Sequence, residues 1–149
     1  MSEHNRIKKL DILSKEIERQ YNETRESHSK ITNSCIILTA INLYTLINLF
    51  NTSNQYAPYI CFLILITLYY AYKCLSIKSL PIGVDIDELA KGIDKSELEL
   101  KETVVANLKD CLEEQREYSL EKAKYYTRLL LISILIFALY TLLIFSNLK

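Results

Sequence analysis

The chain has 149 residues, of which 50% are hydrophobic and 24% charged, and its 18 basic residues balance 18 acidic ones. A net charge of zero gives no electrostatic basis for binding nucleic acid, which depends on cations that neutralise phosphates. The sequence contains neither a recognisable Ser, His and acid set nor metal-ligand spacing, so we expect no enzyme and no cofactor.

Three stretches carry almost no charge and have the length of membrane spans. Segments 31–50, 58–75 and 129–148 contain one cation, Lys73, and no carboxylate. An α-helix needs about 20 residues to cross about 30 Å of hydrocarbon, and the Lys73 side chain can extend its ammonium to the headgroups. The sequence therefore predicts three transmembrane helices.

The charged segments on one side of these spans are expected to be helical as well. Neither Gly nor Pro, the strongest helix breakers, occurs in residues 1–57 or 93–149. Helices are predicted from about Ile7 to Phe50 and from about Glu97 to Ser146. The expected fold is an all-α membrane protein in which two of the three spans continue into parallel helical arms, residues 1–30 and 96–128.

The remaining segments connect these helices. Residues 51–57 are predicted to form an external hairpin, with Pro58 in the first turn of the second span. Residues 76–95 form the connector, in which Asp85 to Gly92 is expected to make one capped helical turn. Ser96 followed by Glu99 fits a capping box at the start of the next helix.

The flanking charges predict the orientation of the spans. Lys and Arg side chains cluster beside the ends that join the arms, whereas the hairpin is uncharged. By the positive-inside rule the N-terminus, the connector and both arms are cytoplasmic, and the hairpin and C-terminal tip are external. We expect a multi-pass protein of the cell inner membrane. The cations concerned are Arg25, Lys30, Lys73, Lys78, Lys122, Lys124 and Arg128.

The arms carry apolar residues at helical spacing, which indicates that they pack together. Such stripes are more often bundle core than ligand site, and the arms are too short to indicate a long coiled coil. The residues expected in this packing are Ile7, Leu10, Leu13, Ile17, Tyr21, Val104, Leu108 and Leu112.

The first span carries an unusual polar band. A primary amide facing hydrocarbon without a partner costs several kcal/mol, so this band must face protein or water. One interpretation is hydrogen bonding between helices of a bundle or oligomer. The other is a water-filled pore lined by copies of this face. The band consists of Ser34, Thr39, Asn42, Thr45 and Asn48.

The first two spans form a tight hairpin, IILTAINLYTLINLF followed by YICFLILITLYYAYKCL, behind a charged helix and before a cytoplasmic helical segment. This layout resembles the SLATT-type and related small membrane effectors of bacterial antiphage systems. The third span, LLLISILIFALYTLLIF, departs from their two-span pattern. The resemblance implies an oligomer that opens or disrupts the inner membrane when its cytoplasmic part senses a signal, often made by a partner protein.

Three functions are compatible with these features. The first is an oligomeric membrane effector that permeabilises or depolarises the membrane, gated through its cytoplasmic helices. The second is a non-conducting anchor or assembly subunit for a cytoplasmic signalling or effector protein. The third, a small transporter, is disfavoured because the spans lack a Gly or Pro break at which a substrate site could form. The expected partners are the lipid bilayer and further copies of the chain.

Overall fold

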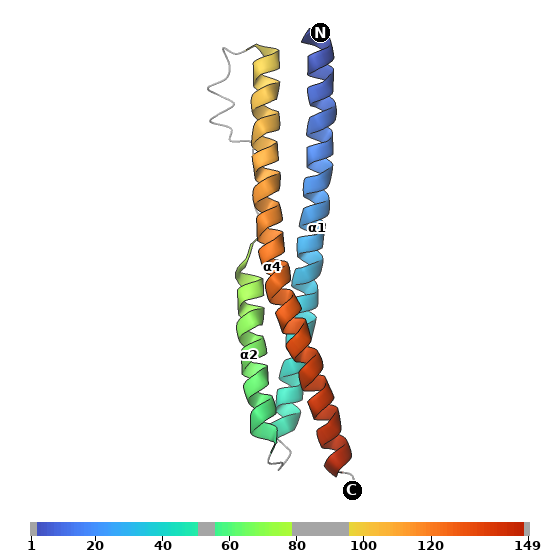
Figure 1. Cartoon of the computed structure of the whole chain (residues 1–149), viewed down its shortest axis with the longest axis vertical. Helices are drawn as coiled ribbons and strands as arrows, with labels where there is room; N and C mark the ends of the chain where they lie inside the picture. The colour runs from blue at the N-terminus through green and yellow to red at the C-terminus, as the bar shows by residue number, and fades with distance from the viewer. Residues whose placement is uncertain (1–2, 51–55, 79–95, 148–149) are drawn as a thin grey trace. The chain divides into compact units, whose positions relative to one another are not determined.

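The computed structural model describes residues 3–50, 56–78 and 96–147, and these form three α-helices (Figure 1). Helix α1 spans Glu3–Phe50, α2 spans Ala57–Ser76 and α4 spans Glu97–Asn147. Each is long and apolar enough to cross a membrane. The expectation of an all-helical chain with three such helices is confirmed, whereas insertion in a bilayer stays a prediction.

The helix ends follow local rules. At the start of α4 the Glu99 amide donates to Ser96 Oγ at 3.4 Å, and the Ser96 amide donates to Glu99 Oε2 at 3.1 Å. This is the predicted capping box, which satisfies two amides that lack helical partners. Pro58 lies in the first turn of α2, as expected. Most of the hairpin and the connector, including the turn expected at Asp85 to Gly92, lie outside the described residues.

The described chain divides into two compact units. The two-helix unit contains residues 3–27 of α1 and 96–119 of α4. The three-helix unit contains residues 28–50 of α1, residues 56–78 with α2, and residues 120–147 of α4. Helices α1 and α4 therefore each contribute to both units without a break in the helix.

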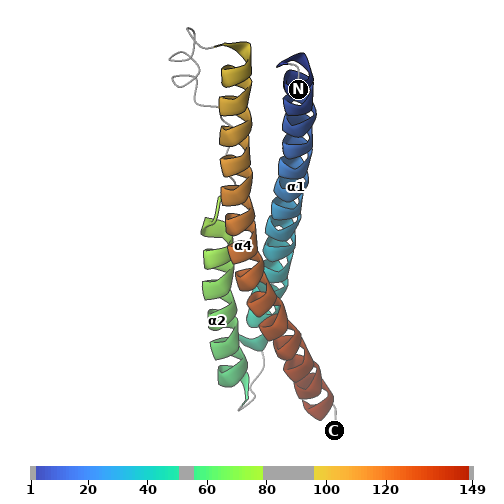
Figure 2. The same cartoon turned by 45° about the horizontal axis from the view of Figure 1, so that its top comes forward.

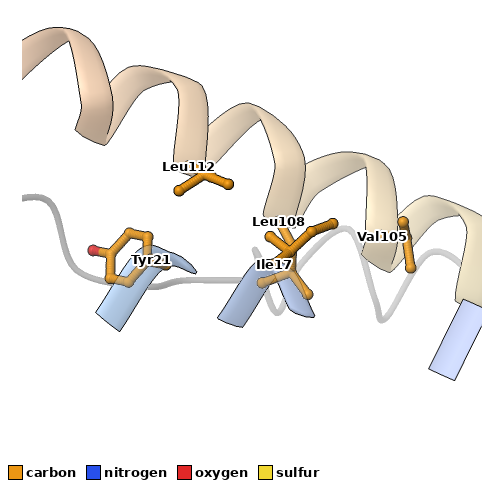
Figure 3. Packing of buried hydrophobic residues seen from close by; sticks show 5 residues of the cluster. All are labelled: Ile17, Tyr21, Val105, Leu108 and Leu112. Atoms are coloured by element: carbon orange, nitrogen blue, oxygen red, sulfur yellow. The ribbon is translucent and has the colours of Figure 1, made fainter. Parts of the chain in front are cut away.

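In the two-helix unit α1 and α4 lie side by side (Figures 1 and 2). Asp11 accepts from Lys101 at 2.7 Å, and Gln20 accepts from Arg116 at 2.8 Å. Since the residue numbers rise together along the two helices, the helices run in the same direction in this unit. Their buried side chains form one cluster between the two helices (Figure 3), which consists of Ile17, Tyr21, Val105, Leu108 and Leu112.

Most residues expected in the arm packing contribute to this cluster, because Leu10 and Val104 pack against its buried members. Ile7 is half-buried outside it. The expectation that Leu13 belongs to the packed stripe is wrong, because 46% of its surface is exposed. It lies about 60° around the helix axis from Leu10, which turns it away from α4.

The three-helix unit has two apolar clusters. One lies toward the hairpin and consists of Leu49, Ile60, Ile64, Ile136 and Leu143. The other consists of Cys35, Ala71, Cys74 and Leu129. Cys35 contacts Ala71, whereas Asn42 contacts Thr67, so residue numbers fall along α2 as they rise along α1. Helix α2 is therefore antiparallel to α1.

Buried positions recur in steps of three, four or seven along every helix. A seven-residue repeat of buried positions is typical of the seam along which coiled-coil helices pack. The sequence interpretation confined the apolar stripes to the arms, but on α1 and α4 the same repeat continues through both units. The seam positions are 17, 21, 28, 35, 42, 45 and 49 on α1, 60, 64, 67, 71 and 74 on α2, and 105, 108, 112, 115, 122, 129, 133, 136 and 143 on α4.

Candidate functional site

Asn42 lies at a polar junction of all three helices. Its Nδ2 donates to Ser133 Oγ on α4 at 2.8 Å and to Thr67 Oγ1 on α2 at 3.3 Å. Thr67 donates its own proton to the Ile64 carbonyl, and Ser133 donates to the Leu129 carbonyl. Both hydroxyls are thus left free to accept from the amide. Only 2% of the Asn42 surface is exposed, and both hydrogen bonds of its Nδ2 are made inside a single chain.

The rest of the polar band does not share this junction. Thr39, Thr45 and Asn48 each donate to a carbonyl four residues earlier on α1, and Ser34 is half-buried. A step of three residues turns about 300° around a helix, so residues spaced by three drift about 60° each time. The band therefore spirals away from the seam. Of its members, only Asn42 and Thr45 are buried.

A groove between α1 and α4 reaches the junction from outside. Its volume is about 270 Å³, and Asn42, Thr45 and Ser133 lie among otherwise apolar walls. Such a groove would face lipid, water or another protein chain if the helices cross a membrane. The apolar residues that line it are Leu38, Ile41, Ile134, Ile136 and Phe137.

A second polar junction is next to the apolar cluster that contains Cys35 and Cys74, seven residues before Cys35 on α1. Lys122 on α4 is 2% exposed, and its Nζ lies 2.7 Å from His28 Nε2, 2.7 Å from Thr32 Oγ1 and 3.1 Å from the Ile77 carbonyl oxygen. An ammonium has three N–H donors, and the surroundings supply three acceptors. Among the described residues no carboxylate pairs with Lys122.

The chemistry of this second junction follows from its burial. Burial lowers the pKa of Lys122 below its ordinary value, because a charged amine is disfavoured away from water. The pKa of His28 is lowered as well, mainly by burial and to a smaller extent by the neighbouring Lys122 cation. His28 is therefore neutral near pH 7, which leaves Nε2 able to accept a hydrogen bond from Lys122.

The sequence interpretation missed this junction. Lys122 was identified only as one of several cations beside a span and His28 was given no role, whereas the structure places the two side chains in contact. One signal could have found them. His28 is seven residues after Tyr21 and seven before Cys35, and Lys122 is seven before Leu129, so both occupy the seam. A seven-residue repeat extended across the arm boundaries would have marked them as buried.

Comparisons with protein-family models, with curated proteins and with solved structures found no match to this chain.

Proposed function

We propose that the chain is an oligomeric effector of the cell inner membrane that permeabilises or depolarises it, gated by repacking of its helices. In this proposal residues 31–50, 58–75 and 129–148 cross the bilayer and the two-helix unit is cytoplasmic. The resemblance of the hairpin to SLATT-type effectors supports a role in antiphage defence.

The open groove beside Asn42 is the observation that carries this proposal. Asn42, Thr45 and Ser133 line it among otherwise apolar residues of α1 and α4. Polar groups at such a position are stabilised by water or by another chain rather than by lipid. Copies of the chain assembled around this face would bring these groups together along a common path.

The hydrogen bonds that Asn42 makes within one chain favour a second candidate, the non-conducting anchor or assembly subunit. Both Nδ2 bonds of Asn42 are made within one chain, which is the arrangement expected of a residue that only holds helices together. In this alternative the activity belongs to a cytoplasmic protein bound by the two-helix unit. As an effector, the chain must instead loosen this junction when it is activated.

The purified full-length chain in liposomes tests the proposal. We expect an oligomer by mass in detergent and release of a small trapped ion, strongly reduced by combined Asn42→Leu and Asn48→Leu. Asn33→Leu is the matched control, because Asn33 is an exposed asparagine on the same helix and should leave the flux unchanged. A monomer, or undiminished flux in the double variant, would overturn the pore. No flux, with a cytoplasmic protein retained by the full chain, would support the anchor.

The defence role is tested in cells. Bacteria expressing the chain should lose membrane potential after phage infection and release fewer phage than cells expressing the Asn42→Leu and Asn48→Leu variant. Equal phage yield from cells with and without the chain, over a panel of phages, would reject antiphage defence while leaving the liposome result unaffected.

A further inference from the structure

The junction at Lys122 joins all three helices of the three-helix unit. Lys122 belongs to α4, its acceptors His28 and Thr32 belong to α1, and the Ile77 carbonyl follows directly on the C-terminus of α2. The last carbonyls of a helix lack helical partners and carry partial negative charge, so an ammonium is a favourable cap there. One cation thus holds two neighbouring helices.

This arrangement depends on the protonation of His28. A neutral imidazole offers one nitrogen lone pair, whereas an imidazolium donates from both nitrogens and accepts from neither. Protonation would remove one of the three acceptors of Lys122 and place a second cation 2.7 Å from its Nζ. At 4% exposure His28 receives little screening from water. Acid therefore opposes the contact both by repulsion and by loss of a hydrogen bond.

Within residues 3–50, 56–78 and 96–147, no carboxylate pairs with Lys122 or His28 to compensate for the added charge. In the part of the chain that the structure describes, the titratable groups that face Lys122 are His28 and Cys35 from α1 and Cys74 from α2. Cys74 Sγ contacts the Lys122 carbonyl oxygen at 3.9 Å, and both cysteines are fully buried. The pair can relieve its repulsion only by releasing a proton or by separating the helices.

We propose that Lys122 and His28 form a proton-sensitive latch, closed while His28 is neutral and opened by acidification, which loosens α1 from α4 and from the C-terminus of α2. The latch is a property of the three-helix unit and stands whether or not the chain conducts ions. Thr32 and the Ile77 carbonyl do not titrate, so protonation of His28 removes one of the three acceptors of Lys122 and the opening is partial and reversible.

Histidine NMR tests the latch directly, because the chain contains only His4 and His28. In the full chain labelled with ¹³C-histidine in nanodiscs, His28→Gln identifies the His28 resonance. We expect this resonance to titrate below its ordinary value of 6.5 and to move upward in Lys122→Met, which keeps an unbranched side chain but removes the cation. A His28 titration unchanged by Lys122→Met would overturn the proposal.

Thiol labelling measures the opening of the latch in the unmodified chain. Cys74 is fully buried beside the latch, whereas Cys61 is half-buried elsewhere on α2 and serves as an internal control. With a disulfide reagent active in acid, labelling of Cys74 relative to Cys61 should rise on acidification below about pH 6.5, by at most about tenfold per pH unit for one proton. His28→Gln, whose amide oxygen accepts without titrating, should abolish this rise. No rise in the unmodified chain, or the same rise in His28→Gln, would overturn the latch.

Discussion

Asn42 and Ser133 lie 91 residues apart in the chain, yet Asn42 Nδ2 donates to Ser133 Oγ at 2.8 Å. This bond joins α1 to α4 at the centre of the three-helix unit, within one of the seam layers. The Thr67 hydroxyl accepts from the same amide, so a single side chain connects all three helices.

The coupling between Asn42 and Ser133 can be measured by a double-mutant cycle. We expect Asn42→Leu and Ser133→Ala to show a coupling energy of about 0.6–2 kcal/mol, because a hydrogen bond between membrane helices has this strength. Reversible unfolding of the full chain in mixed micelles is the measurement. Asn33→Leu combined with Ser133→Ala is the control and should be additive, since Asn33 is exposed and lies nine residues before Asn42 on α1. Additive effects at Asn42 would contradict the bond.

The core of the two-helix unit predicts a contrast between two leucines. Leu108 is buried in the cluster and Leu13 is largely exposed. Leu108→Ala should lower the free energy of unfolding by about 2–5 kcal/mol because it leaves a cavity, whereas Leu13→Ala should change it by about 0.5 kcal/mol or less. Local hydrogen exchange in residues 10–24 of the full chain reports both. Equal effects would show that Leu13 is buried by another chain.

The direction of the two helices is tested by cross-linking. A short bismaleimide should join cysteines placed at Asp11 and Lys101, whose side chains form an ion pair at 2.7 Å. Cysteines at Asp11 and Arg116 are the matched control and should not be joined, because the fifteen-residue shift along α4 moves the second site by about 22 Å. Cys111 is replaced by Ser in both proteins. Efficient joining of the control pair would rule out the parallel arrangement.

Acidification should affect the two units differently. His28 has a lowered pKa, so the stability it confers is complete above about pH 6.5 and is lost as the pH falls through 6.5 toward the lower value in the folded chain. A hydrogen bond from Arg19, and a weaker effect of one from Gln20, lower the pKa of Glu16 from 4.5 to about 2. The small stability that this exposed side chain contributes is therefore complete above pH 4.5 and is lost only toward pH 2.

Hydrogen exchange between about pH 7 and pH 5, corrected for the intrinsic rate, checks this difference. We expect protection to fall around His28 and Lys122 and to hold around Glu16. His28→Gln should remove the fall. Loss of protection around Glu16 over the same range would instead indicate general acid unfolding.

Features set by neighbouring residues were predictable from the sequence. The capping box of Ser96 and Glu99 needs only two residues three apart, and the lengths of α1 and α4 follow from the absence of Gly and Pro. The apolar windows of the three helices likewise depend on composition alone.

Features set by tertiary packing were not predictable in the same way. The polar band identified Asn42, but its partners Thr67 and Ser133 are far away in the sequence. The band also included residues that do not face the interior, because positions spaced by three turn progressively away from the buried side of a helix. Lys122 and His28 were missed because each residue alone has an ordinary explanation. The seam brings both to the interior, where no carboxylate of the described residues pairs with the buried lysine.

The lysine in the seam also limits how the helices can be aligned. Leu, Ile and Val layers fit almost as well after a shift of one heptad, so an entirely apolar seam would permit sliding. Sliding α4 by seven residues along α1 would bring Lys122 level with Cys35 and Thr39 in one direction, or with Tyr21 and the cation Arg25 in the other. Neither position offers the imidazole acceptor, and a buried ammonium that loses its acceptors costs several kcal/mol. Lys122 therefore favours the observed alignment of α1 and α4 over the two alignments that are shifted by seven residues.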